Sequence, residues 1–156
     1  MSFTAYYHSP VGWLRITTDN THVLRIAFVP GAGTGTTPSE QPPILRETIQ
    51  QLAEYFAGQR SAFELPLRPA GTPFQQTVWR ALQTIPYGHT ISYRELARRV
   101  GKPKAYRAVG NANGKNPIPI IIPCHRVIQS NGALGGYSSG LHIKQFLLEL
   151  EKKFSY

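Results

Sequence analysis

The sequence predicts an α+β protein in two parts: a small antiparallel sheet with one helix, followed by a mostly helical half. Three observations indicate this. Short β-rich segments follow one another near the amino terminus, and helix-forming segments dominate after residue 73. Between them, residues 65–73 contain three prolines and a glycine, which is typical of a linker. We therefore expect one domain over residues 1–70 and a second over residues 71–156.

The first half contains three segments typical of strands, at 3–7, 13–17 and 23–29, joined by short turns that favour an antiparallel meander. Residues 30–38 are rich in glycine, threonine and proline and offer little to bury, so we expect a mobile loop there. A helix is predicted over residues 44–56. Its apolar side is formed by Leu45, Ile49, Leu52, Ala53 and Phe56.

The second half begins with a predicted helix over residues 74–85. A second helix, over residues 91–100, has a clear start signal, because Ser92 can cap it while Glu95 reaches back to complete a capping box. A third helix is predicted from Pro103 to about Asn113. Two short helices joined by a glycine turn are the helix-turn-helix pattern.

Two further elements are predicted near the carboxy terminus. Residues 130–133, Ser-Asn-Gly-Ala, are typical of a hairpin turn and are a candidate wing beside the helix pair. The last helix is expected from Leu141 to about Lys153, with Ser139 as its cap.

Positive charge is concentrated in the second half. Residues 1–70 hold five basic and five acidic residues, whereas residues 71–156 hold twelve basic and three acidic residues and so carry the whole net charge of +9. This asymmetry favours a polyanionic partner, because neutralised phosphates release counterions. The alternative at this point is an ordinary solvated basic surface.

Composition excludes several classes of protein. With one cysteine the chain forms no internal disulfide, and its five histidines are too scattered to indicate a zinc site. The longest apolar run, 118–122, is too short to span a bilayer, and the first residues lack the pattern of a signal peptide. We expect a cytoplasmic, nucleoid-associated protein without a membrane anchor.

The predicted third helix has one narrow apolar side, which leaves Tyr106, Arg107 and Gly110 pointing outward. Small residues let a helix lie close to a nucleic-acid groove, while Arg107 and nearby lysines such as Lys104 can meet phosphates or replace a base in the stack. An ordinary helical hairpin is the alternative. The apolar side comprises Ala105, Ala108, Val109 and Ala112.

Cys124 is the candidate nucleophile. A lone cysteine at the end of an apolar run is more often an inert buried thiol. A reactive cysteine needs a base or a nearby positive charge, and His125 and Arg126 follow it directly. Because adjacent residues of an extended chain point to opposite sides, the geometry between the thiol and the imidazole stays open. Glu151, on the apolar stripe of the last helix, is a candidate partner for His125, with a surface glutamate as the alternative.

The run from Asn116 to Val127 is preceded by Arg107-Ala-Val-Gly and followed by Gly135-Gly-Tyr-Ser. This combination closely resembles the O6-alkylguanine-DNA alkyltransferases, also called methylated-DNA–protein-cysteine methyltransferases. The resemblance is dense from Phe74 to Glu151 and weak before residue 70. It implies a ribonuclease H-like amino-terminal domain and a winged helix-turn-helix-like carboxy-terminal domain.

The resemblance also implies roles for individual residues. Cys124 corresponds to the alkyl acceptor, His125 to a base acting through a water molecule, and Glu151 to the carboxylate that orients it. Asn116 corresponds to the residue that braces the turn before the acceptor. The guanine pocket would include Tyr93, which can also give a proton or hydrogen bond to the leaving guanine, with Val127, Tyr137 and Ser138. We expect DNA contacts from Arg107, which replaces the flipped base, and from Tyr106, Gly110, Lys104 and Arg126.

The implied reaction is repair of alkylated DNA, in which the Cys124 thiolate attacks the alkyl carbon on O6 of guanine; O4 of thymine is a further candidate. The thioether product has no acyl carbon for water to attack, so each acceptor is used once. No metal or other cofactor is required. The expected partner is double-stranded DNA containing O6-alkylguanine, bound by a monomer that can associate along DNA.

Two other classes share parts of this pattern. A cysteine hydrolase could use Cys124, His125 and Glu151 but would turn over repeatedly. A reader of alkylated DNA or a winged-helix regulator would explain the charge and the helices, and would keep its function without the thiol.

Two residues depart from the family pattern. Tyr106 places a large ring where a small residue is expected, which changes the fit to DNA or adds stacking on a sugar. Ser139 lies where family members differ, near the pocket mouth, so tolerance of large O6 substituents stays open.

Overall fold

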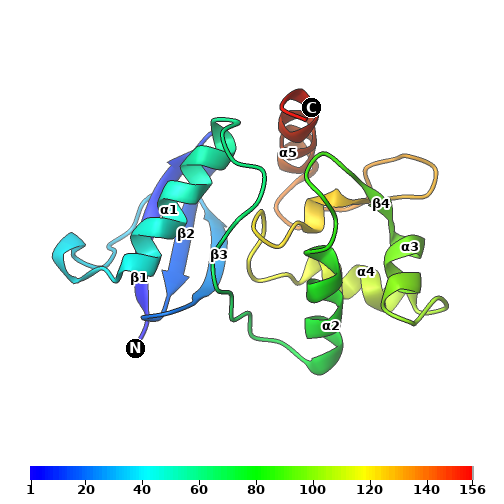
Figure 1. Cartoon of the computed structure of the whole chain (residues 1–156), viewed down its shortest axis with the longest axis horizontal. Coiled ribbons are helices and arrows are strands. Elements are labelled where there is room, and N and C mark those ends of the chain that lie inside the picture. The colour runs from blue at the N-terminus through cyan, green and yellow to red at the C-terminus, as the bar shows by residue number, and fades with distance from the viewer. Residues whose placement is uncertain (156) are drawn as a thin grey trace. The chain divides into compact units, whose positions relative to one another are not determined.

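The computed structural model describes residues 1–155 and divides into two compact units, Met1–Ala70 and Gly71–Tyr156. The first contains the sheet, and the second contains most of the helices (Figure 1). The predicted α+β class is confirmed. No helix within residues 1–155 combines the length and the apolar character needed to cross a membrane.

The first unit is a three-stranded antiparallel sheet in the order β1 (Phe3–Ser9), β2 (Gly12–Thr18), β3 (Val23–Val29). Helix α1 (Pro43–Phe56) packs against all three strands, as Figure 1 shows. Alternation along the strands sends one set of side chains toward this helix. The resulting core includes Leu14, Ile16, Ile26, Leu45 and Leu52.

The segment after β3, predicted as a mobile loop, is irregular apart from the 3-10 turn η1 (Pro38–Glu40). It is tied to the sheet near its end, because the Thr36 amide donates to the Thr4 carbonyl at 2.7 Å and the Thr4 amide donates to the Thr36 hydroxyl at 2.9 Å. These bonds cover part of the edge of β1.

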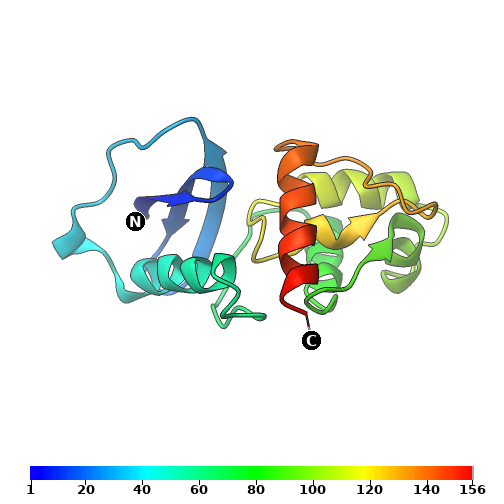
Figure 2. The same cartoon turned by 90° about the horizontal axis from the view of Figure 1, so that it is seen from above.

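In the second unit, α2 (Pro73–Leu82) begins with a capping box between Thr72 and Gln75. It packs against α4 (Tyr106–Gly114), where the buried Trp79 ring donates to the Ala112 carbonyl at 2.9 Å. Helix α5 (Leu141–Lys153) contacts the 3-10 turn η2 (Cys124–Arg126), and Figure 2 shows the red helix beside the yellow segment that holds this turn. These contacts fix the surroundings of Cys124.

Helix α3 (Tyr93–Arg99) has the predicted Ser92 cap, whose hydroxyl accepts from the Glu95 amide at 3.0 Å. The predicted reciprocal bond, in which the Glu95 carboxylate accepts from the Ser92 amide, is wrong, because that carboxylate pairs with Arg98 at 2.6 Å and Arg99 at 2.9 Å. Two guanidinium partners outcompete one backbone amide for the same oxygens.

The predicted start of one helix and the predicted cap of another need correction. Helix α4 begins at Tyr106, not Pro103, because the preceding residues form a turn in which the Ala105 amide donates to the Lys102 carbonyl. Helix α5 is preceded by Gly140 with φ 116°, so the predicted Ser139 cap is wrong. Glycine adopts this conformation at little cost.

The predicted wing is present only as a turn. The Gly132 amide donates to the Gln129 carbonyl at 3.0 Å, and the Gln129 amide donates to the Ala133 carbonyl at 2.9 Å. The strand before this turn, β5 (Val127–Ile128), pairs in parallel with β4 (Ile91–Ser92), and no antiparallel return strand follows it within residues 1–155. The turn therefore leads from β5 into residues 134–140 and then into α5.

Candidate active site around Cys124

Cys124 lies at the first position of η2, directly after the proline-rich segment 117–123. Its side chain is only 5% exposed. The segment includes Ile120, which is fully buried and has φ 75°, an unusual left-handed conformation for a β-branched residue. Such a conformation costs about 1–3 kcal/mol and persists only where surrounding bonds enforce it.

Asn116 supplies these bonds. Its side-chain amide donates to the Ile122 carbonyl at 2.7 Å, and its side-chain oxygen accepts from the Ile118 amide at 2.9 Å. One side chain thus joins the two ends of the strained loop. The amide of Asn116 also interacts with the Cys124 thiol.

The 3-10 turn resolves the geometry that the sequence left open. In this tight helix successive side chains are about 120° apart. Cys124, His125 and Arg126 therefore point in three directions, and all three are buried. His125 turns away from the pocket, and its Nε2 lies 2.6 Å from a carboxylate oxygen of Glu151.

Glu151 is the buried centre of a hydrogen-bonded network. It accepts from Arg126 Nε at 2.8 Å and from the Gly88 amide at 3.2 Å, in addition to its bond with His125. Burial raises the pKa of the Glu151 carboxyl, but the bonds from His125 and Arg126 outweigh it and bring the pKa to about 2. A charged carboxylate beside Nε2 keeps the proton on that nitrogen, so Nδ1 is the free acceptor of the ring.

His125 Nδ1 is fully buried and makes no hydrogen bond with any residue from 1 to 155. Burial lowers the pKa of His125, and its bond with Glu151 opposes this shift. The imidazole is therefore neutral at neutral pH and has one unprotonated nitrogen. This is the state that a general base requires.

Arg126 does not occupy the predicted DNA-binding position. Its guanidinium is held by Glu151, donates to the Ile85 carbonyl at 2.6 Å and lies 5.8 Å from the centre of the Tyr87 ring. The side chain is only 7% exposed. The prediction that Arg126 contacts DNA is wrong, because a buried and fully engaged guanidinium cannot reach a phosphate.

A cavity of about 200 Å³ adjoins Cys124. Of the residues predicted for the pocket, Tyr93, Tyr137 and Ser138 line it, together with Gly110, Asn116 and Ser139. The Tyr137 hydroxyl interacts with the Cys124 thiol, and the Ser138 hydroxyl donates to the Gly114 carbonyl at 2.7 Å. Val127 is not among the lining residues described; its side chain is fully buried.

Burial raises the pKa of the Cys124 thiol. Four interactions oppose this shift: those with the side chain of Asn116, the positive charge of Lys144, the backbone of Cys124 itself and the Tyr137 hydroxyl. The thiolate is thus disfavoured by desolvation and favoured by donors that already surround the sulfur. Proton removal by a base such as His125 fits this environment.

Lys144 is the residue that the sequence analysis missed. Its side chain is fully buried, and Nζ donates to the Val127 carbonyl at 2.7 Å and to the Gly136 carbonyl at 3.1 Å. Burial lowers the pKa of Lys144 to about 8. One signal could have found it: Lys144 lies three residues before Leu147 and seven before Glu151, on the apolar stripe of the last helix.

Replacing Lys144 with methionine is expected to move the pH dependence of Cys124 reactivity to higher pH. The ammonium lowers the pKa of the thiol, and methionine keeps the volume without the charge. The measurement is the alkylation rate of Cys124 as a function of pH. Lys153→Met, exposed on the same helix, is the control, and an identical profile for both variants would refute this influence of Lys144.

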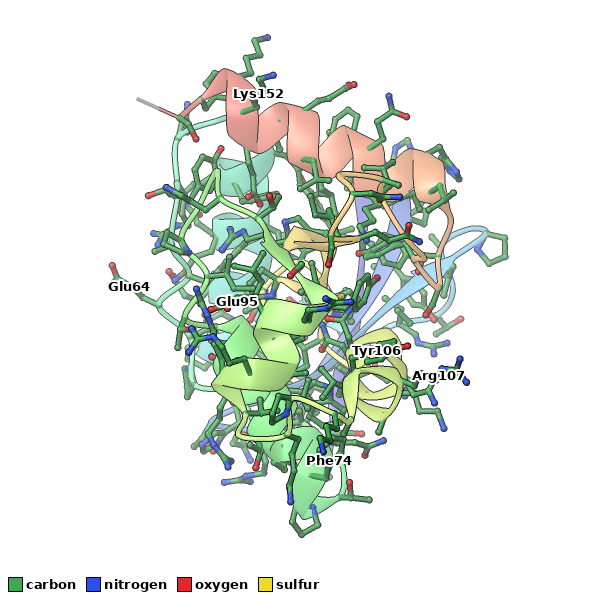
Figure 3. The ribbon with its side chains drawn as sticks, turned by 90° about the vertical axis from the view of Figure 1, so that its right-hand side faces the viewer. Glu64, Phe74, Glu95, Tyr106, Arg107 and Lys152 are labelled. Carbon is green, nitrogen blue, oxygen red and sulfur yellow. The ribbon has the colours of Figure 1, made fainter. Side chains whose placement is uncertain are left out.

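The predicted groove-facing residues lie on the surface of the second unit. Lys104 and Arg107 are exposed, and Tyr106 is 48% exposed. Figure 3 shows Tyr106 and Arg107 on the same helix, with Arg107 extending away from it. Ala108, predicted to face the core, is also exposed, so the solvent-facing side of α4 is wider than its apolar pattern indicates.

Comparison with known proteins identifies the family. The DNA binding domain of 6-O-methylguanine DNA methyltransferase matches residues 73–153, and the ribonuclease-like domain of the same family matches residues 3–69. The chain belongs to this family. The resemblance stated from the sequence is thus confirmed, and this methyltransferase carries its candidate acceptor within the DNA-binding domain.

Two relatives align with most of the methyltransferase. A methylated-DNA–protein-cysteine methyltransferase of Methanosarcina acetivorans is 47% identical, with 96% of this chain and 97% of the relative aligned. The constitutive Bacillus subtilis protein of that name is 56% identical over 74% of this chain and 71% of its own length.

Solved structures support the same fold. The O6-methylguanine methyltransferase of Mycobacterium tuberculosis has a TM-score of 0.88 at 42% identity, covering 100% of this chain and 96% of the other. The M. tuberculosis OGT solved in complex with DNA has a TM-score of 0.86 at 43% identity, covering 96% and 92%.

Proposed function

We propose that this methyltransferase repairs O6-alkylguanine in double-stranded DNA by transferring the alkyl group to Cys124. The observation that carries the proposal is a buried thiol that lines a cavity within a DNA-binding domain, directly before a histidine held by a buried carboxylate. The relatives' name, methylated-DNA–protein-cysteine methyltransferase, supports the same chemistry. We place this activity in the cytoplasm, at the nucleoid.

Binding brings the lesion to the thiol. The exposed face of α4 lies against the DNA, and the target nucleotide leaves the stack to enter the cavity, because its alkyl carbon is unreachable inside a duplex. Arg107 occupies the space that the base leaves. Lys104, Tyr106 and Gly110 contact the backbone near it.

In the chemical step, the Cys124 proton passes through a water molecule to His125 Nδ1, and Glu151 stabilises the resulting imidazolium. The thiolate attacks the alkyl carbon, a sulfur–carbon bond forms, and the bond between that carbon and O6 breaks, leaving its electron pair on guanine. Burial raises the pKa of Tyr93, so its hydroxyl stays protonated and can donate to the departing base. Tyr137 and Ser138, which line the cavity, complete the guanine site.

The reaction should stop after one equivalent. The product is a thioether, which has no acyl carbon open to hydrolysis, so Cys124 is not regenerated. Titrating excess lesion-containing duplex with known amounts of protein should repair one lesion per chain. Continued repair beyond one equivalent would instead indicate a hydrolase.

The proposal also covers the oligomeric state and the range of substrates. We propose that the protein acts as a monomer that can associate along DNA, and that alkyl groups on O4 of thymine are secondary substrates.

Ser139 lines the cavity, so its side chain should affect the size of the alkyl group that the cavity accepts. If Ser139→Trp accepts bulky O6 adducts as readily as the parent, this position does not control size.

A further inference from the structure

Asn113 lies on the buried side of α4, and the proposed chemistry does not use it. Its side chain is buried, and the residue lines the acceptor cavity beside Cys124. Two other residues of α4, Gly110 and Gly114, line the same cavity. Because glycine has no side chain, the Asn113 amide is the only polar side-chain group that α4 contributes to the described lining.

The two ends of the Asn113 amide differ in their bonding. Nδ2 donates to the Cys124 carbonyl at 3.4 Å, which places the amide beside the alkyl acceptor. Oδ1 is buried and makes no hydrogen bond with any residue from 1 to 155. Since Nδ2 is held by a carbonyl, Oδ1 is the end that can accept from a ligand. A buried acceptor without a partner is costly, so its presence in a cavity wall indicates a ligand that donates to it.

Two other acceptors around the cavity are already engaged. Asn116 is the second lining residue with a side-chain amide, and its oxygen accepts from the Ile118 amide at 2.9 Å. The Gly136 carbonyl accepts from Lys144 Nζ at 3.1 Å. The described lining residues include no carboxylate. Of these three acceptors, Asn113 Oδ1 is the one left open for a base that carries an N–H donor.

O6-alkylguanine has one donor that fits this acceptor. Alkylation of O6 removes the proton from N1, so the edge of the base that pairs in a duplex keeps N–H bonds only on the 2-amino group. A flipped base is recognised by hydrogen bonds to this edge. When the alkyl carbon lies at the Cys124 thiol, the 2-amino group follows along the same edge, and the amide that contacts the Cys124 carbonyl is placed to meet it.

We propose that Asn113 Oδ1 accepts a hydrogen bond from the 2-amino group of the flipped O6-alkylguanine and thereby sets specificity for guanine. The inference rests on the proposed function, since it concerns the base that enters the acceptor cavity. Gly110 and Gly114 leave room for the flat ring against α4, while Asn113 meets its edge. A purine without the 2-amino group leaves Oδ1 unpaired and is therefore a poorer substrate.

The test compares two duplexes of identical sequence, one with O6-methylguanine and one with O6-methylhypoxanthine, which differs only in lacking the 2-amino group. The readout is the ratio of the two second-order rate constants for methyl transfer. A change in thiol reactivity or in folding affects both substrates alike and cancels in this ratio. Asn113→Leu, which keeps the shape without the polar atoms, should lower the ratio about tenfold relative to the parent, as expected for one lost hydrogen bond.

Two further variants make the comparison specific. Asn113→Asp keeps an acceptor at this position, so its ratio should stay near that of the parent even where both rate constants fall. Asn111→Leu changes an exposed asparagine of the same helix and should leave the ratio unchanged.

Equal ratios in the parent and Asn113→Leu would overturn the inference. Loss of the parent's preference for O6-methylguanine in Asn113→Asp would also overturn it, and this variant decides the matter if Asn113→Leu does not fold. A parent protein that accepts no methyl group from either duplex would refute the proposed function instead.

Discussion

Replacing Glu151 with glutamine is expected to slow methyl transfer by at least about a hundredfold, the contribution of a positioned general base. Glutamine keeps the size of the side chain but removes the charge that holds Nε2 of His125 protonated and supports the imidazolium. It also leaves the buried Arg126 guanidinium without its counter-ion. Loss of one partner of a buried ion pair costs about 3 kcal/mol or more of unfolding free energy.

The same variant should change the acid stability of the protein. The pKa of Glu151 is depressed to about 2 in the folded chain, against an ordinary value of 4.5. Its contribution is therefore fully present above about pH 4.5 and is lost as the pH falls toward 2. Glu151→Gln should be less stable than the parent at pH 7, and the difference should shrink on acidification.

Single-turnover rates and denaturant unfolding at several pH values measure both effects. Glu149→Gln, exposed on the same helix, is the matched control and should behave as the parent. A Glu151→Gln variant with the parent's rate and stability would show that the network does not act on Cys124.

Replacing Asn116 with alanine should be nearly as damaging. The substitution leaves the Ile118 amide and the Ile122 carbonyl without their side-chain partner, and both flank the strained Ile120. Each unsatisfied buried group costs about 1–3 kcal/mol. Asn116 also lowers the pKa of the Cys124 thiol, so its loss disfavours the thiolate. Loss of the brace should in addition displace the acceptor loop, and a displacement of about 1 Å slows a reaction about a hundredfold. We therefore expect Asn116→Ala to react about a hundredfold more slowly than the parent.

Thermal unfolding and the single-turnover rate check this expectation together. Asn111→Ala, an exposed asparagine on α4, controls for loss of an amide from the same region. If Asn116→Ala unfolds and reacts like the Asn111→Ala control, the brace is not needed to hold the acceptor loop.

Local sequence patterns predicted most of the fold. Alternation and turn residues predicted the three strands, and apolar periodicity predicted the helices, because these signals lie within a few residues of one another. Capping interactions that depend on competition between partners were predicted wrongly. The Glu95 carboxylate pairs with two arginines instead of making its predicted capping bond. Helix α5 is preceded by a glycine with positive φ instead of the predicted serine cap.

The site was less accessible to sequence reasoning because its partners are far apart in the chain. Without the family resemblance, Cys124 stayed a buried thiol with a suggestive neighbour, and Glu151 stayed either a partner of His125 or a surface glutamate. His125 and Glu151 are 26 positions apart, and β5, a loop and most of α5 lie between them, so no local pattern determines that they meet. Arg126, predicted to contact DNA, and Lys144, which no pattern singled out, show the same limit: both are buried and donate to carbonyls of distant residues.

The most direct test of Cys124 as the acceptor is the intact mass of the protein after incubation with duplex DNA containing O6-methylguanine. The predicted spectrum shows one methyl group per chain, located by peptide mapping to Cys124, and no addition in Cys124→Ser. An unchanged mass after the lesion has been repaired, or a methyl group on any other residue, would contradict the proposed transfer to Cys124.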